Sequence, residues 1–260
     1  MKSEKSETLK PNLINILILI YKFRVLNRNQ IQNILNHKYR SRIITWLNYL
    51  TEEKYLIRKY SKEFAGIPAE YCLATKSRSE LKKQNEIKAT LLDRIYKEKS
   101  LSETFRKHSM FLADIYLSLI AVTKKNKVKL NYYTQTDLVG IKYLILPIPD
   151  AYFSIKENKK LTKRYFLDVF DQRDPRLAYR KRLKQYSNYF ANRYWQDNTD
   201  KSFPEIIMVV PDIVMRKYLN RKIKQLLNGE GQEILFYLST WDEIKSQGIK
   251  REVLHKVEIE

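Results

Sequence analysis

Between residues 101 and 240 the sequence alternates segments of helical periodicity with short β-rich runs, and this alternation constrains the fold more than any other feature. Residues 101–123 space apolar side chains as a helix does, and the runs "KVKLNYYTQ", "DAYFSI" and "RYFLDVF" then indicate three strands. A basic helix over 175–195, the run "EIIMVVP", a helix over 212–227 and the run "ILFYLST" follow. The predicted order is α-β-β-β-α-β-α-β, an α+β arrangement.

Two aspartates accompany these strands. Asp150 opens the second strand, and Asp168 lies inside the third. This placement is typical of restriction-endonuclease-like α-β-β-β-α-β cores, in which carboxylates on neighbouring strands hold a divalent cation that activates water and neutralises a phosphate. Asp150 and Asp168 are therefore candidate catalytic residues and candidate ligands of Mg²⁺ or Mn²⁺. The other interpretation is that they are the polar ends of two strands.

The predicted helix after the third strand is strongly basic. From Arg176 to Arg193 it carries six basic residues and no acidic residue, which favours contact with phosphates over a merely solvated face. Lys181 and Lys184 are candidate catalytic cations that act with the two aspartates. The candidate DNA contacts on this helix are Arg180 and Arg182.

The first 96 residues have a different pattern. Apolar side chains recur at helical spacing from Leu13 to Phe23, and Asn27 is placed as the cap of a short second helix. A third helix runs into a strand within "YRSRIITWLNYLTEEKYLIRKY". Gly66 and Pro68 then mark a turn, and "EYCLA" returns as a second strand before a further helix. This is the order of elements in a winged helix-turn-helix.

The start of the third helix supplies candidate DNA contacts, because in a winged helix this helix enters the major groove while the hairpin rests on nearby phosphates. The candidates on the helix and the hairpin are Lys38, Tyr39, Arg40, Arg42, Thr45 and Lys59. The alternative for Arg40 and Arg42 is that they only solvate a helix face. The spacing of Ile43 and Leu47 favours the core.

Composition agrees with a nucleic-acid partner. The 260 residues carry a formal charge of +21, while 43% hydrophobic and 12% aromatic residues argue against disorder. We therefore expect a folded cytoplasmic protein that binds double-stranded DNA, with one domain over residues 1–96 and another over 97–260. A single cysteine excludes an internal disulfide framework. The most apolar segment, residues 13–20, is too short for a membrane span.

Five motifs together resemble the replication-relaxation family of plasmids and conjugative elements. They are "AEYCLATKSRSEL", "FRKHSMFLADIY", "PIPDAYF", "YFLDVFD" and "KRLKQYSNYF", and the resemblance covers roughly residues 10–215. It implies a relaxase-like protein with a nuclease-like core that nicks a transfer origin. Other mobilisation or replication proteins are then implied as partners.

The sequence departs from the family pattern at three positions. Asp168 stands where the family has glutamate, Phe170 stands where it has a second carboxylate, and Arg182 stands where its lysine is expected. A tyrosine nucleophile of the relaxase type is an alternative, but the spacing of Tyr186, Tyr189 and Tyr194 also fits an apolar helix face, which favours packing. Two functions therefore remain open. One is a relaxase that recognises double-stranded origin DNA and nicks it with a divalent cation, and the other is a non-catalytic winged-helix regulator or replication accessory protein with a degenerate nuclease domain.

Overall fold

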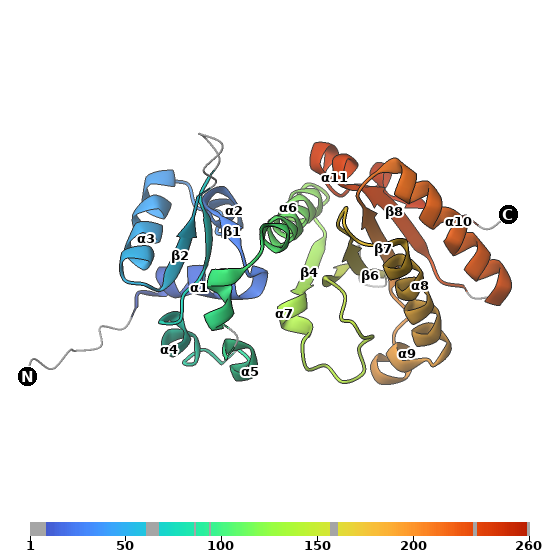
Figure 1. Cartoon of the computed structure of the whole chain (residues 1–260), viewed down its shortest axis with the longest axis horizontal. Coiled ribbons are helices and arrows are strands. Elements are labelled where there is room, and N and C mark those ends of the chain that lie inside the picture. Colours follow the sequence, from blue (N-terminus) through green and yellow to red (C-terminus); the bar gives the residue numbers. More distant parts are fainter. Residues whose placement is uncertain are drawn as a thin grey trace, which may run out of the picture. The chain divides into compact units, whose positions relative to one another are not determined.

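The computed structural model describes residues 9–60, 68–85, 87–93, 95–156, 161–230 and 233–258. The chain forms two compact units, Met1–Ala113 (unit 1) and Asp114–Glu260 (unit 2), and both combine helices with a β-sheet (Figure 1). The division lies within the helix α6 (Glu103–Lys125). The domain boundary expected after residue 96 stays a prediction.

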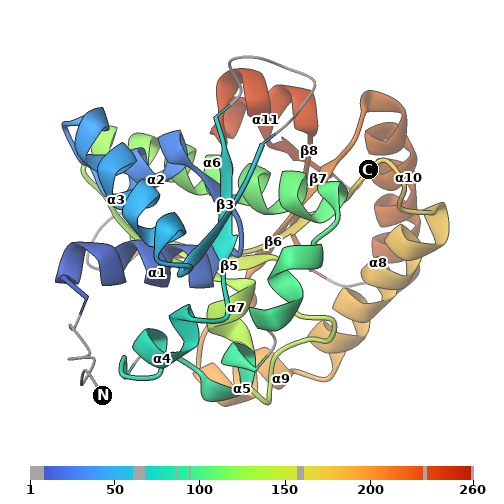
Figure 2. The same cartoon turned by 60° about the vertical axis from the view of Figure 1, so that its left-hand side comes forward.

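Unit 1 places its helices around a small antiparallel sheet in the strand order β1-β3-β2 (Figure 2). Its elements before α6 are α1 (Pro11–Phe23), β1 (Leu26–Asn27), α2 (Arg28–Ile34), α3 (Arg40–Glu52), β2 (Leu56–Lys59), β3 (Glu70–Leu73), α4 (Ser77–Leu81), α5 (Ala89–Leu92) and η1 (Ile95–Ser100). The expected turn residue Gly66 lies outside the described residues.

Local sequence accounts for these helices. Proline at the first position of α1 is compatible with a helix start, since its missing N–H has no partner there in any case. The predicted cap of α2 is confirmed, because Asn27 Oδ1 accepts the Gln30 N–H at 2.9 Å and Gln30 Oε1 accepts the Asn27 N–H at 3.0 Å. The predicted core face of α3 is also confirmed, with Ile43 and Leu47 fully buried.

Unit 2 is built on a six-stranded mixed sheet in the order β4-β5-β6-β7-β8-β9. Strands β6, β7 and β8 run parallel, and the remaining neighbours pair antiparallel. The elements after α6 are β4 (Lys129–Thr134), α7 (Gln135–Leu138), β5 (Ala151–Lys156), β6 (Thr162–Val169), α8 (Arg176–Ala191), α9 (Tyr194–Thr199), β7 (Glu205–Val210), α10 (Ile213–Glu230), β8 (Phe236–Thr240), α11 (Trp241–Gln247), η2 (Arg251–Val253) and β9 (His255–Lys256). The predicted order of main elements is observed, with α7, α9, α11 and β9 added.

Helices cover both faces of this sheet. Figures 1 and 2 show α8 and α10 side by side over one face, whereas α6 lies against the other. Side chains alternate between the faces along each strand. Tyr132 therefore meets Tyr116 of α6, with 4.7 Å between ring centroids, while its neighbour Tyr133 and the paired Tyr152 lie on the opposite face. The α8 face is the one that carries Asp168.

The centre of the sheet is continuously apolar. All residues from Ile206 to Val210 in β7 are buried, as expected for a parallel strand covered on both faces. At the edge of the layer, α11 ends at Gly248 with φ of +72°, and a Cβ there would collide with Ser118 Oγ. Ser118 Oγ accepts the Ile249 N–H at 2.8 Å, so glycine allows this close approach of the helix end to α6.

Candidate functional site

The two predicted site aspartates lie close together, because Asp150 immediately precedes β5 and Asp168 lies on the neighbouring strand β6. Ala151 at the start of β5 pairs with Leu167 of β6, which places Asp150 beside Asp168 in the register. Asp150 Oδ2 accepts the Val169 N–H at 2.8 Å, and the Asp150 carbonyl accepts the Gln135 N–H at 2.9 Å. The Asp150 side chain therefore links the start of β5 to the end of β6 by a hydrogen bond.

Asp168 is at the centre of a buried polar network. Arg182 of α8 donates Nε to Asp168 Oδ2 at 2.7 Å and Nη2 to Oδ1 at 2.9 Å, a two-pronged ion pair. The Tyr186 hydroxyl donates to Oδ2 at 2.8 Å, and Arg182 Nη1 donates to the Pro147 carbonyl at 2.6 Å. Asp168 is 8% exposed and Arg182 is 5% exposed, so these contacts replace water.

Helical spacing brings the two α8 partners together. Arg182 and Tyr186 are four residues apart and so lie on the same helix face, where the guanidinium carbon is 4.5 Å from the tyrosine ring centroid. Burial and the neighbouring Asp168 carboxylate raise the pKa of Tyr186 well above its usual value. Burial is the largest single influence on Arg182 and acts to lower its pKa, but Asp168 and Tyr186 together outweigh burial, so the net change in the pKa is upward. Tyr186 stays a hydroxyl donor, and Arg182 stays charged.

This network does not fit a Mg²⁺ or Mn²⁺ site. Both oxygens of Asp168 already accept hydrogen bonds, and a guanidinium cation lies where a metal would need to approach. Hard divalent cations take about six oxygen ligands, mostly carboxylates, carbonyls and water. Across the described part of the chain, no three histidine, cysteine or acidic residues gather as metal ligands do. As they lie here, the Asp150 carboxylate is bonded to the end of β6, and the Asp168 carboxylate joins β6 to α8.

The basic residues of α8 divide into two groups. Lys181, Lys184 and Arg180 are exposed, so the structure does not bring the two predicted catalytic lysines together with the buried Asp168. The prediction that Arg182 contacts DNA is corrected by the structure. The Arg182 side chain is buried, and its N–H groups donate to Asp168 and to the Pro147 carbonyl inside the protein. The three exposed residues lie at the surface, and their contact with phosphate stays a prediction.

Phe170 and two of the three tyrosines considered as nucleophiles are buried in the core of unit 2. Phe170 is 9% exposed and stacks on Tyr179 with ring centroids 4.3 Å apart, so the position holds a core residue. Tyr186 and Tyr189 are buried, which confirms the packing interpretation for both. The packing interpretation is wrong for Tyr194, which is 54% exposed because it follows the end of α8, although its ring stacks on Tyr189 with 6.2 Å between centroids.

The start of α3 is exposed, and it carries most of the predicted DNA contacts. Those exposed at the surface are Lys38, Tyr39, Arg40, Arg42 and Thr45. The first turn of α3, which is described throughout, has no acidic residue. Lys59 on β2 is placed differently, since its ammonium donates to the Lys99 carbonyl at 2.9 Å. The helix start therefore presents cations and a helix N-terminus, both of which attract phosphate.

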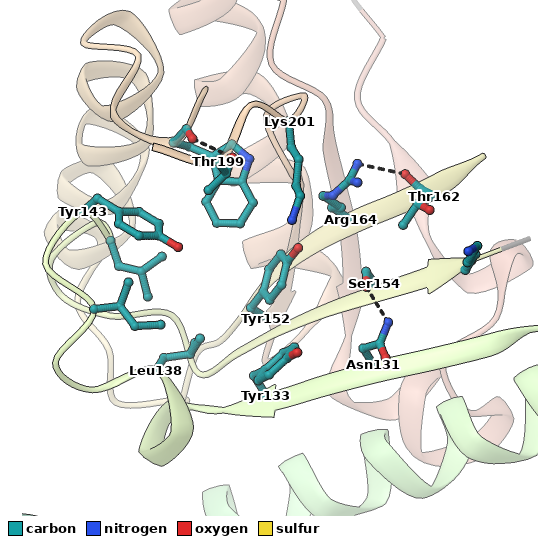
Figure 3. Close-up of a pocket in the computed structure, with 14 residues that line it drawn as sticks. Asn131, Tyr133, Leu138, Tyr143, Tyr152, Ser154, Thr162, Arg164, Thr199 and Lys201 are labelled. Carbon is teal, nitrogen blue, oxygen red and sulfur yellow. Dashed lines mark hydrogen bonds between the residues drawn. The ribbon is translucent and has the colours of Figure 1, made fainter. Parts of the chain in front are cut away.

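A second candidate surface escaped prediction from sequence. A pocket of about 430 Å³ opens over β4, β5 and β6, and its lining includes Tyr133, Tyr152, Arg164 and Lys201 (Figure 3). Because side chains alternate along a strand, Tyr133, Tyr152 and Arg164 lie on the same face of the sheet. This alternation is the sequence signal from which the three could have been grouped. Lys201 comes from the segment after α9, which no strand pattern could have linked to them.

Comparison with known proteins gives a family and one structural likeness. The family profile described as replication-relaxation matches residues 17–206. Among solved structures, the restriction endonuclease FokI is similar with a TM-score of 0.31 and 10% sequence identity, over 93% of this chain and 45% of the FokI chain. The chain thus spans less than half of that endonuclease, and a likeness this low carries no conclusion about fold or activity. Comparison with curated proteins gave no match.

Proposed function

Because the chain belongs to the replication-relaxation family, we propose that it binds double-stranded DNA in the replication or mobilisation of a plasmid or conjugative element. In this proposal unit 1 is a winged helix that recognises the DNA. Unit 2 has a nuclease-like fold that grips DNA without cutting it. The protein is then a regulator or replication accessory protein, with a site that has lost its metal chemistry.

The exposed basic start of α3 carries the first part of the proposal. Lys38, Arg40 and Arg42 crowd one helix N-terminus, where phosphate oxygens or base edges in a major groove are the natural ligands. The antiparallel strands β2 and β3 follow α3 directly, as the wing follows the recognition helix. The net charge of +21 supports a polyanionic partner for the whole chain.

The Asp168–Arg182 pair carries the second part. The order of helices and strands in unit 2 and the adjacency of Asp150 and Asp168 favour descent from a metal-dependent nuclease, so origin nicking is the second candidate function. The position of Arg182 is evidence against origin nicking. Arg182 donates hydrogen bonds to both oxygens of Asp168, the carboxylate that a catalytic cation would need as a ligand. Gripping DNA through the exposed cations of α8 requires no metal.

Removing two cations from the start of α3 tests the role of unit 1. We expect Arg40→Ala with Arg42→Ala to weaken binding of a duplex carrying the element's origin by tenfold or more, since each specific base contact contributes about 1–3 kcal/mol. Fluorescence anisotropy measures the dissociation constant. The control, Lys82→Ala with Arg221→Ala, removes the same charge from exposed positions elsewhere. Equal affinities for the two double variants would refute recognition by α3.

Cation titration separates the two candidate functions. We expect calorimetry with Mn²⁺ to show no site that depends on Asp150 or Asp168, with or without DNA, because Arg182 already neutralises Asp168. Supercoiled plasmid carrying the origin should stay closed when Mn²⁺ is added. Nicking that disappears in Asp150→Asn and Asp168→Asn variants, both folded by circular dichroism, would establish the relaxase instead.

A further inference from the structure

The pocket over β4, β5 and β6 is assembled from alternate positions of three neighbouring strands. Tyr133 pairs with Tyr152, and Ser154 pairs with Arg164, so these side chains form two cross-strand rows on one face. Figure 3 shows the rows rising from the sheet, with Tyr143 on the opposite rim and Lys201 reaching toward Tyr152. The volume of about 430 Å³ lies within the range of roughly 300–1,000 Å³ usual for small-ligand sites.

Aromatic rings form one part of the pocket wall. The rings of Tyr133 and Tyr152 are nearly parallel, with 5.8 Å between centroids and 29° between planes. Tyr152 is supported from behind by Trp195, at 5.2 Å between centroids. Tyr133 is 45% exposed, so the outermost ring has a free surface on which another flat ring can stack.

Positively charged side chains form another part of the pocket wall. Arg164 and Lys201 both line the pocket, and none of the described lining residues is acidic. Arg164 donates Nη1 to the Thr162 carbonyl at 3.2 Å, which directs the guanidinium along the sheet. Burial raises the pKa of Tyr152 to about 12, an effect that Arg164 partly offsets, so Tyr152 is uncharged at neutral pH. The pocket therefore offers flat apolar rings beside cations.

Flat rings beside cations recognise a base and its phosphate. We propose that this pocket binds an unpaired nucleotide of single-stranded DNA, with the base stacked on Tyr133 and the phosphate held by Arg164 and Lys201. Charge complementarity selects a nucleic acid over an apolar or cationic partner. A base inside a duplex is already stacked on its neighbours and cannot enter, so the nucleotide has to be unpaired. The inference does not depend on duplex recognition by α3.

Two substitutions at Tyr133 test stacking. We expect Tyr133→Leu to weaken binding of a fluorescein-labelled oligothymidine by about tenfold, because base–aromatic stacking contributes on the order of 1–3 kcal/mol per base. Tyr133→Phe keeps the ring and should bind as the wild type does. Tyr194→Leu is the matched control, since Tyr194 is a 54% exposed tyrosine of the same unit outside the pocket lining.

Loss of a pocket cation tests the phosphate contact. Lys201→Ala should lower the salt slope of oligothymidine binding by about 0.7, the value for one neutralised phosphate of a single strand. Lys217→Ala removes one charge from an exposed position on α10 and should leave the slope unchanged. Photo-crosslinking to an oligonucleotide that contains 5-bromodeoxyuridine should label peptides that contain Tyr133 or Tyr152.

Several results would rule out an unpaired DNA nucleotide in this pocket. The proposal is overturned if Tyr133→Leu and Lys201→Ala bind oligothymidine as their controls do, or if crosslinks map only outside the pocket. Preference for oligouridine RNA, or competition by thymidine monophosphate without binding of the strand, would also overturn single-stranded DNA as the ligand. Failure of duplex recognition in the Arg40 and Arg42 double variant leaves these measurements unaffected, so the two proposals can fail separately.

Discussion

Replacing Asp168 by alanine should lower the free energy of unfolding by about 3–5 kcal/mol. The substitution leaves the Arg182 guanidinium buried and charged at 5% exposure, without the carboxylate that accepts two of its hydrogen bonds. It also removes the acceptor of the buried Tyr186 hydroxyl. Arg182→Ala should destabilise similarly, because the carboxylate is then the buried charge without a partner.

Denaturant unfolding of both single variants and of the double variant measures this network. The two losses should not add, since removing both partners leaves neither charge uncompensated. Asp197→Ala breaks the exposed Arg193–Asp197 pair and should cost less than about 1 kcal/mol. Wild-type stability of Asp168→Ala would contradict the structural role, and a loss of Mn²⁺ binding without loss of stability would restore the metal interpretation.

Periodicity was sufficient to predict most elements of the fold. The helical spacing in α1 and α3, the Asn27–Gln30 cap and the order of strands β4 to β8 all follow from local sequence. The helix expected over residues 175–195 is wrong in one respect, because it is two helices, α8 and α9. Arg193 adopts a left-handed φ of 54° between them. Glycine, asparagine and aspartate are the residues that favour this conformation, so an arginine gives no sign of it in the sequence.

The candidate site was less predictable than the fold. The sequence predicted Asp150 at the start of one strand and Asp168 within the next, and the structure has Asp150 just before β5 and Asp168 on the neighbouring β6. The partner of Asp168, in contrast, depends on how α8 lies on the sheet. Fourteen residues separate Asp168 from Arg182, and no local pattern fixes which face of α8 turns inward. The absence of acidic residues from this helix predicted contact with phosphate, which stays a prediction, and it gave no sign that Arg182 is buried against Asp168. Tyr133 and Lys201 were not predicted to line one pocket for the same reason, since only the tertiary packing of the chain brings them together.

Duplex binding should depend steeply on salt. If six or more phosphates are neutralised, the affinity should fall by about 10³-fold or more between roughly 50 and 200 mM salt, because each contact releases condensed counterions. The net charge of +21 and the exposed cations at α3 and α8 are the physical basis.

Anisotropy titrations of one labelled duplex at several salt concentrations measure the slope of log affinity against log salt. Lys181→Ala with Lys184→Ala should reduce that slope by about 2 if both lysines of α8 contact phosphates, while Arg182→Lys should change it little, since the side chain at that position is internal. A flat salt dependence for the wild-type protein would refute electrostatic recognition of DNA altogether. A slope that falls only in the Arg40 and Arg42 double variant would instead confine DNA contact to unit 1, and the exposed lysines of α8 would then serve only to keep that helix face solvated.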